Sequence, residues 1–502
     1  MKSRRQPAGH GARGARSAVA GGPPPTPPRS LAPRGLRALA ALALFAATAG
    51  PAHATRYYVR ESGSDAADGR SSATAWRTIE RANAADLEPG DRLMFEGGGR
   101  FAGKVVIGPD DAGTARKPVT ISSFGRGRAT IDAGTGGGIL VHDAGGVRIV
   151  RVNVVGSGRA AGNRSDGISF YTDLATPGSR LPFARVDHVE VSGFGKSGLI
   201  LGGWAWDDAT QTPIKTGFAD VRFFDVDSHD NADAGILTYG SYGTNVSGWA
   251  HANVLVDRCR SHANPGIPGK GGNSGNGIGL VDVDGCRITR SLAWDNGWLN
   301  DAASGPIGIW AWDSNRVVIE DNEAWGNRLG TRDGGGFDLD GGATNCTMRR
   351  NTSHDNVGSG FLVYQFGGAR PMRDNRVSDN RSTNDGRTNG GGLVVGGGAV
   401  RTTFERNRVE VEPRAPGAGS DGPYGVHVVL DGAVNVDTVF RDNRIATTGG
   451  VPLLVVPQPA LQPGLLFEGN AWDSGSGPTA IAWGTSTFDS VAAWTAATGE
   501  GP

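Results

Sequence analysis

The segment Asp333–Asn356 reads DGGGFDLDGGATNCTMRRNTSHDN and contains one unit of the repeat that determines the fold. In its first part Phe337 and Leu339 alternate with Asp338 and Asp340, which is the period-2 pattern of a strand with one dry and one wet face. A turn and two shorter segments follow, and each of these segments ends in Asn. The unit therefore predicts three short strands joined by tight turns.

The same unit recurs from Val119 onward, as expected for a repeat protein. Each unit opens with a glycine followed by an apolar residue, and successive pairs lie 24 to 42 residues apart, so a fixed frame carries loops of variable length. The pairs are Gly167-Ile168, Gly198-Leu199, Gly235-Ile236, Gly277-Ile278, Gly308-Ile309, Gly336-Phe337, Gly360-Phe361, Gly392-Leu393 and Gly425-Val426.

Stacked coils of three short strands enclose a continuous apolar interior, which a single row of strands cannot do. The sequence thus predicts an all-β fold, a single-stranded parallel β-helix over residues 119–470. About ten coils at about 4.8 Å each would make a rod roughly 50 Å long. Residues 55–118, with an amphipathic helix at about Ala75–Asn83, form an N-terminal cap, and residues 471–502 form a short C-terminal cap.

Polar and aromatic residues recur at fixed places in the repeat. Inward asparagines at one turn can hydrogen-bond along the stack, and the predicted ladder is Asn322, Asn351, Asn375 and Asn407. A second row, on the third strand, consists of His229, His262, Trp294, Trp325 and His354. We interpret this row mainly as a lateral structural ladder, with His354 and Asp355 as a possible proton-transfer pair.

The three cysteines do not form a disulfide framework or a zinc pattern. Cys286 and Cys346 align with Val317 at one position of three successive coils, so two inter-strand spacings, about 9.6 Å, separate them. That separation exceeds the reach of a disulfide. Cys259 falls at a position of the asparagine ladder. We expect three buried free thiols.

Composition restricts the class of protein further. The 502 residues include 82 glycines, and 50 basic residues balance 50 acidic ones, so binding of nucleic acid through bulk charge is not expected. Residues 1–54 contain arginines, the apolar run Leu36–Gly50 and the sequence Ala52-His53-Ala54, the features of a signal peptide. We expect secretion, to the periplasm or the medium, with Thr55 as the mature N-terminus and no membrane span afterwards. A retained membrane anchor is the alternative, although the apolar run is short for a span.

Several segments together resemble the pectate-lyase-like right-handed parallel β-helix superfamily, in particular its secreted bacterial proteins with an N-terminal cap. The resemblance covers nearly all of the mature chain and is specific for the fold. It rests on YYVRESGSDAADG, AWRTIERAN, LEPGDRLMFEGGGRFAG, KPVTISSFGRGRATIDAG and the Asn-terminated repeats. It implies a polysaccharide-degrading protein, either a lyase or a glycoside hydrolase. Lyases of this kind use an acidic calcium cluster and a Lys or Arg base; no such cluster stands out here, and the lysines to consider are Lys196 and Lys270.

Aligning the repeats places aromatic side chains beside a carboxylate pair on one outward face. Asp338 and Asp340 would lie roughly 6.5–7 Å apart, at the boundary between the inverting and retaining geometries of glycosidases, slightly favouring inversion. One carboxyl would act as acid and the other as base, and Asp313 and Asp333 are reserve candidates. The aromatic residues expected to stack on sugar, or simply to cover the sheet, are Tyr171, Tyr239, Trp310, Trp312 and Tyr364.

Three functions follow from these patterns. The first is a secreted, monomeric enzyme that hydrolyses glycosidic bonds of a polysaccharide without a cofactor. The second is a calcium-dependent lyase that acts on a uronic-acid polymer and needs a Lys or Arg base; separately, Asp338 and Asp340 could bind calcium with backbone carbonyls instead of being catalytic. The third is a non-catalytic β-helix that binds glycans, for which the two aspartates would be an ordinary solvated face.

Overall fold

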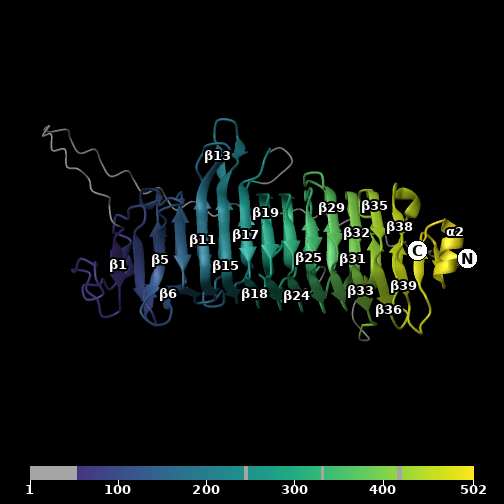
Figure 1. Cartoon of the computed structure of the whole chain (residues 1–502), viewed down its shortest axis with the longest axis horizontal. Helices are drawn as coiled ribbons and strands as arrows, with labels where there is room; N and C mark the ends of the chain where they lie inside the picture. The colour runs from purple at the N-terminus through teal and green to yellow at the C-terminus, as the bar shows by residue number, and fades with distance from the viewer. Residues whose placement is uncertain (1–53, 242–246, 303, 329–332, 415–420, 502) are drawn as a thin grey trace, which may run out of the picture.

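The computed structural model describes residues 54–241, 247–302, 304–328, 333–414 and 421–501. The expected signal peptide therefore lies outside the described residues, apart from its last position. The described chain forms a rod in which strands stack side by side from the N-terminal to the C-terminal end (Figure 1). None of the helices in these ranges has the length and apolar character needed to span a bilayer.

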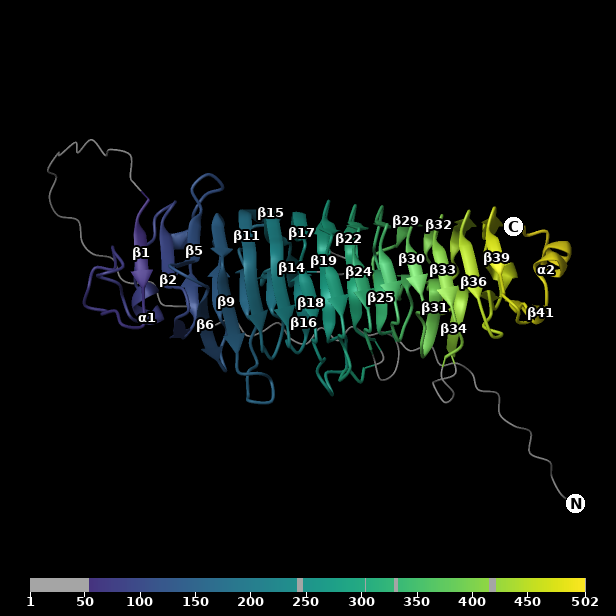
Figure 2. The ribbon, with the colours of Figure 1, turned by 60° about the horizontal axis from the view of Figure 1, so that its bottom comes forward.

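Parallel pairing connects the strands into three rows, which are the faces of a parallel β-helix (Figure 2). Row 1 consists of β4 (Val105–Ile107), β7 (Ile139–His142), β10 (Ile168–Thr172), β12 (Leu199–Gly203), β16 (Ala234–Tyr239), β19 (Asn276–Asp284), β22 (Ile307–Asn315), β25 (Gly335–Asp340), β28 (Phe361–Tyr364), β31 (Asn389–Gly396), β34 (Asp421–Val428), β37 (Leu454–Val456) and β40 (Ile481–Trp483).

Row 2 consists of β1 (Arg56–Val59), β2 (Arg92–Glu96), β5 (Val119–Phe124), β8 (Val147–Val150), the first halves of β11 (Ser179–Ser192) and β15 (Thr216–His229), β17 (His251–Asp257), β20 (Arg287–Thr289), β23 (Val318–Glu320), β26 (Thr347–Arg349), β29 (Arg373–Ser378), β32 (Val400–Glu405), β35 (Val436–Arg441) and β38 (Leu466–Glu468). Row 3 consists of β3 (Arg100–Ala102), β6 (Ala129–Gly134), β9 (Val152–Gly156), the second halves of β11 and β15, β18 (Arg260–His262), β21 (Leu292–Trp294), β24 (Glu323–Trp325), β27 (Thr352–His354), β30 (Arg381–Thr383), β33 (Arg408–Val411), β36 (Arg444–Thr447) and β39 (Ala471–Asp473).

Row 1 has thirteen strands in the described part of the chain, more than the roughly ten coils expected. The additional coils lie at the two ends, where β4 and β7 already pair in parallel and β37 and β40 continue the row. An antiparallel hairpin of β13 (Ala205–Asp207) and β14 (Thr212–Ile214) projects from the rod (Figure 1).

Aromatic side chains fill the interior in register from coil to coil. Phe337 stacks on Phe361 with ring centroids 5.1 Å apart. Phe404, Phe440 and Phe467 continue the same kind of stack at 4.7 and 5.0 Å. All five rings are at most 1% exposed, so each of these five coils buries one large ring against a neighbouring coil.

Short helices lie near the two ends of the rod. The helix expected at 75–83 is confined to α1 (Ile79–Ala82), because Trp76 instead pairs as an extended residue with Val59. Near the other end, β41 (Ser486–Phe488) precedes α2 (Val491–Thr498), whose Trp494 is fully buried. Two 3-10 turns, η1 (Pro109–Asp111) and η2 (Pro459–Leu461), complete the elements of the described chain.

Two asparagine ladders run inside the turns. One consists of Asn322, Asn351, Asn380, Asn407, Asn443 and Asn470, each bonded to the next through its side chain. The prediction of Asn375 in this ladder was wrong: Asn375 accepts a hydrogen bond from the Cys346 N–H, at the turn before row 2. The segment 371–380 carries asparagines five residues apart, and Asn380 is the one in register. The second ladder consists of Asn231, Asn264, Asn296, Asn327, Asn356 and Asp385.

The cysteines occupy the predicted positions. All three are buried and free. Cys286 and Cys346 flank Val317 in the register, and Cys259 donates its N–H to Ser291 at the head of the first asparagine ladder. Burial raises the pKa of Cys259 and Cys286 to about 12, so these thiols are inert at neutral pH.

Candidate active site

The candidate site lies on the outward face of row 1, where β25 provides two carboxylates. The register aligns Trp310, Asp338 and Leu362 in successive strands and places Asp340 beside Tyr364. The predicted alternation is therefore present, with Phe337 and Leu339 inside the rod.

Asp338 and Asp340 have different surroundings. Asp338 is 4% exposed, and its Oδ1 has no hydrogen-bond partner among the described residues. Asp340 is partly exposed and accepts the Gly341 N–H at 2.8 Å. Burial, followed by the charges of Asp340 and Asp333, raises the pKa of Asp338 well above its usual range. Burial raises the pKa of Asp340 to about 7, against the effect of the Gly341 hydrogen bond. Burial and the neighbouring charge therefore favour the neutral form of these carboxyls, Asp338 above all.

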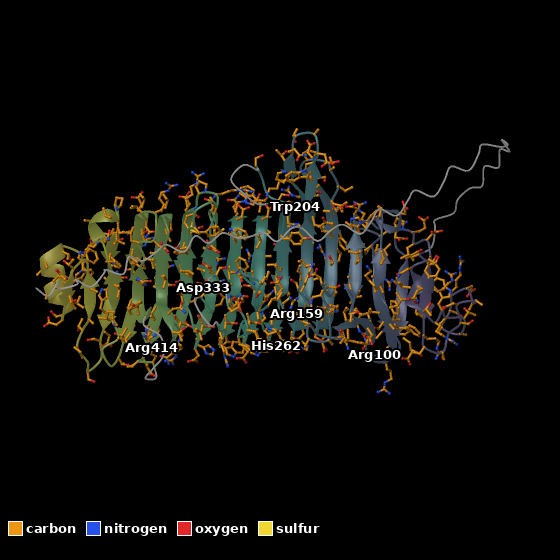
Figure 3. All side chains as sticks on the ribbon, turned by 180° about the vertical axis from the view of Figure 1, so that it is seen from behind. Arg100, Arg159, Trp204, His262, Asp333 and Arg414 are labelled. Carbon is orange, nitrogen blue, oxygen red and sulfur yellow. The ribbon has the colours of Figure 1, made fainter. Side chains whose placement is uncertain are left out.

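Asp333 joins this pair from the loop that leads into β25. The residue has a left-handed φ of 63°, and its Oδ2 accepts the Gly305 N–H at 2.9 Å. Its charge raises the pKa of both Asp338 and Asp340. In the view from behind, Asp333 lies over the middle of the rod, whereas His262 lies along the lower edge (Figure 3). Asp333 is thus electrostatically coupled to both carboxyls of the pair.

Asp313 belongs to a neighbouring buried ionic group. It is 2% exposed, donates its N–H to the Gly341 carbonyl, and lies 3.0 Å from Arg370 Nε. Asp282 and Lys215 form a second ion pair, and Arg370 links the two at 4.0 Å from Asp282. Burial raises the pKa of Asp313 to about 6, although Arg370 opposes the shift.

Asp313 and Arg370 form an ion pair without a hydrogen bond. Although their atoms lie within ion-pair distance, neither Asp313 oxygen nor Arg370 Nε has a hydrogen-bond partner among the described residues. The repeat could have indicated that Asp282 and Asp313 lie side by side, since they occupy equivalent positions in the paired strands β19 and β22. Lys215 follows the β13–β14 hairpin and Arg370 lies in the loop after β28, so no repeat position predicted them.

The two tryptophans of β22, in row 1, pack against neighbouring side chains. Trp310 is 5% exposed and packs with Val281 and Ile307 over Gly279, where a Cβ would lie 2.7 Å from the Trp310 Nε1. Of the two roles left open for Trp310, the structure favours cover of the sheet. Trp312 packs against Phe366, with ring centroids 5.9 Å apart.

The tyrosines are more accessible and line the same face. Tyr171 and Tyr239 stack across the intervening glycine of β12, with centroids 6.4 Å apart, and the Tyr171 hydroxyl donates to the Trp204 carbonyl. The Tyr364 hydroxyl donates to Asp431 Oδ2 at 2.9 Å, next to Asp340. These three tyrosines are partly exposed on the outer side of row 1.

His354 does not join the aspartates. It lies at the end of β27 in row 3, pairs with Asp355 at 3.0 Å and Glu323 at 3.3 Å, and stacks on Trp325. The stack continues through Trp294, His262 and His229 with interplanar angles of at most 8°, as predicted for a lateral ladder.

The two lysines considered as the base of a lyase lie near aspartates other than Asp338 and Asp340. Lys270 Nζ binds both oxygens of Asp233, at 2.7 and 2.9 Å. Burial raises the pKa of Asp166 to about 6, and the charges of Lys196 and Lys270 oppose the shift. This group lies beside β10, β12 and β16, which are five, four and three strand spacings, or about 24, 19 and 14 Å, along the rod from Asp338.

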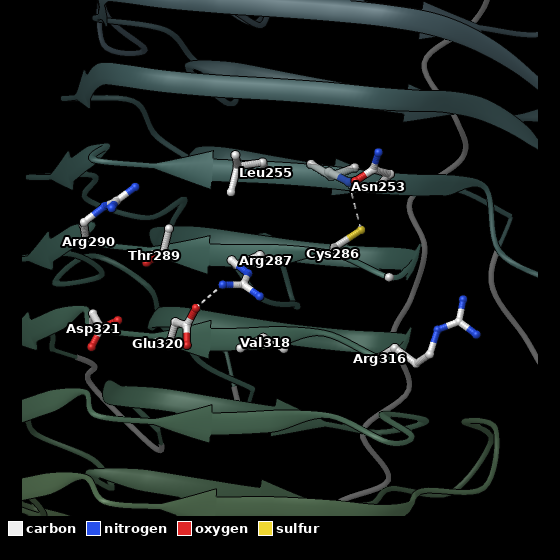
Figure 4. Close-up of a pocket in the computed structure, with 12 residues that line it drawn as sticks. Asn253, Leu255, Cys286, Arg287, Thr289, Arg290, Arg316, Val318, Glu320 and Asp321 are labelled. Carbon is white, nitrogen blue, oxygen red and sulfur yellow. Dashed lines mark hydrogen bonds and ion pairs between the residues drawn. The ribbon is translucent and has the colours of Figure 1, made fainter.

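A groove of about 600 Å³ lies elsewhere, on row 2. Figure 4 shows Arg287 directed at Glu320 across neighbouring strands, with Cys286 at the edge of the groove. Its charged lining is explained by ion pairs, since Glu320 also binds Arg349 and Arg350 at 2.7 and 2.8 Å. We therefore place the candidate chemistry on row 1.

Comparisons with known proteins support the fold. A family model described as a right handed β-helix region matches residues 214–409. The structure of a GH136 lacto-N-biosidase from Eubacterium ramulus aligns with a TM-score of 0.54 and 16% identity, covering 76% of this chain and 67% of that one. A lacto-N-biosidase of Bifidobacterium longum subsp. longum is 39% identical over 74 residues, which are 14% of this chain and 5% of that protein. The prediction of a right-handed parallel β-helix is confirmed.

Proposed function

We propose that this protein is a secreted enzyme that hydrolyses glycosidic bonds of a polysaccharide or oligosaccharide at Asp338 and Asp340. The observation that carries the proposal is the pair of carboxyls at the end of β25, one buried without a partner on Oδ1 within the described chain and one hydrogen-bonded to a backbone N–H, on a face that also carries tyrosines. The similarity to lacto-N-biosidases and to other β-helix proteins supports activity on a carbohydrate.

The surroundings of the two carboxyls suggest a division of roles. Asp338 is the more deeply buried, and its Oδ1 is free of hydrogen bonds within the described chain, so it retains the proton and acts as the acid. Asp340 accepts a backbone N–H, which favours its ionised form, and it acts as the base or nucleophile. Asp333 raises the pKa of both residues and adjusts the pH at which they work.

The proposal is tested with a panel of polysaccharides and lacto-N-biosidase substrates, assayed for reducing ends and ultraviolet absorbance. Asp338→Asn and Asp340→Asn should each lower the rate by about 10²–10⁴-fold, the usual contribution of acid–base groups. Thr347→Ala, on the outward face of row 2, is the matched control and should retain activity. Reducing ends that persist unchanged in both Asp variants would disprove the assignment.

A calcium-dependent lyase is the second candidate, because the group formed by Lys196, Lys270, Asp166 and Asp233 joins lysines to carboxylates beside the tyrosines. A lyase would give ultraviolet-absorbing products that disappear with chelator and with Lys270→Ala. Binding without any product on the panel would favour a glycan-binding β-helix.

A further inference from the structure

A histidine and two aspartates meet at the ends of two adjacent row 1 strands. His142 is the last residue of β7, Asp143 follows it, and Asp173 directly follows β10. His142 Nε2 lies 3.0 Å from Asp173 Oδ1 and 3.6 Å from Asp143 Oδ2. One potential ligand atom from each residue lies within 4.8 Å of the other two.

The local structure holds these side chains in place before any ligand arrives. Asp143 has a left-handed φ of 51°, and its Oδ1 accepts hydrogen bonds from Thr172 Oγ1 at 2.8 Å and the Asp173 N–H at 3.1 Å. Its Oδ2 is thereby directed toward His142. The His142 ring stacks on Tyr171 with centroids 5.7 Å apart and an interplanar angle of 11°. Such outer contacts fix the orientation of a metal-binding imidazole.

The charges of the three residues are not balanced. Among the described residues, the ion pairs of Asp143 and Asp173 involve only His142, and a neutral imidazole can donate its single proton to one carboxylate at a time. Two carboxylates this close are stabilised by a shared cation.

We propose that His142, Asp143 and Asp173 bind a divalent transition-metal ion. An imidazole nitrogen with two carboxylate oxygens suits Zn²⁺ or Mn²⁺, whereas Ca²⁺ prefers six to eight oxygen ligands. The three side chains are partly exposed, at 33%, 14% and 33%, so an ion can enter and keep a position open for water or a substrate oxygen.

This site is separate from the candidate active site. Six strand spacings from β7 to β25, about 29 Å along the rod, separate it from Asp338. Tyr171 connects it to the tyrosine-lined part of the same face. The ion would therefore stabilise the N-terminal end of row 1 or bind a polar group of a glycan. It would take no part in the chemistry at Asp338.

The test measures zinc binding by calorimetry and elemental analysis on chelator-treated, re-buffered protein. The wild type should bind one Zn²⁺ per chain, and His142→Asn and Asp173→Asn should each weaken binding by about 100-fold or more. His188→Asn is the matched control, because among the described residues His188 forms an ion pair with a single carboxylate, Asp225, at 3.8 Å. Circular dichroism verifies that each variant folds.

A second measurement uses the wild type alone, in case the variants do not fold. Modification of histidines by diethylpyrocarbonate, located by mass spectrometry, should be slowed by Zn²⁺ at His142 and unchanged at His188. An excess of Ca²⁺ or Mg²⁺ should not reproduce the protection. The proposal is overturned if the wild type binds no stoichiometric Zn²⁺, if His142→Asn binds it equally well, or if His142 remains unprotected.

Discussion

Replacing Asn351 by alanine should destabilise the rod far more than a typical surface substitution. The Asn351 Nδ2 donates to the Ile319 carbonyl at 2.9 Å and to Asn380 Oδ1 at 3.0 Å, and its Oδ1 accepts the Asn322 N–H at 3.1 Å and Asn322 Nδ2 at 3.0 Å. The residue is 1% exposed. Asn351→Ala would leave one backbone carbonyl and one backbone N–H buried without a partner.

The magnitude follows from those two groups. Each unsatisfied buried backbone group costs about 1–3 kcal/mol, so the free energy of unfolding should fall by about 2–6 kcal/mol. Thr352→Ala is the matched control, since Thr352 is the next residue, lies on the outward face of β27, and should change stability by less than about 1 kcal/mol.

The assay is chemical unfolding together with hydrogen exchange. A long repeat fold need not unfold in one step, so the exchange rate of the Asn322 amide gives a local reading of the same effect. Its protection should drop in Asn351→Ala and persist in Thr352→Ala. If the two variants are equally stable and equally protected, the ladder contributes no net stability and the reasoning is refuted.

Three further predictions concern charge and thiols. Because the pKa of Asp340 is raised to about 7, the folded protein keeps a proton on this carboxyl that the unfolded chain releases above about pH 4. The free energy of unfolding should therefore fall as the pH rises to about 7. In thermal melts Asp340→Asn should show a weaker pH dependence and should be more stable than the wild type at pH 8. Glu405 is fully buried, and hydrogen bonds from Arg376, Arg406 and Arg441 hold its pKa low; because these arginines are about half exposed and can be hydrated, Glu405→Gln should cost about 1–3 kcal/mol in denaturant unfolding, whereas no loss of stability would contradict the network. Thiol titration of the unreduced protein should find no reactive group when native and three groups in denaturant, and fewer than three would indicate a disulfide.

The repeat made most of the fold predictable from the sequence. Alternating residues such as Phe337 and Asp338 identify inward and outward positions, because successive side chains of a strand point to opposite faces. The error at Asn375 shows the limit of this approach. Two asparagines five residues apart both fit the pattern, and only pairing of β26 with β29 identifies Asn380 as the ladder residue.

The candidate site could be found only in part. The sequence indicated Asp338, Asp340 and the nearby tyrosines, since they lie at fixed places in the repeat. It could not show that Trp310 covers Gly279 or that Asp313 lies against Arg370. Those outcomes depend on which turns bring which strands together.

The sequence by itself determined the coil, the rows, the buried thiols and the outward carboxylates, because a repeat converts local periodicity directly into stacking. Tertiary structure alone decided what the variable loops bring to that frame. Lys215 and Arg370 meet Asp282 and Asp313 across four separate coils, and Asp173 meets His142 because β7 and β10 are neighbours in row 1. Loop lengths differ from coil to coil and carry no period, so side-chain positions beyond the strand ends depend on packing and charge rather than on the repeat.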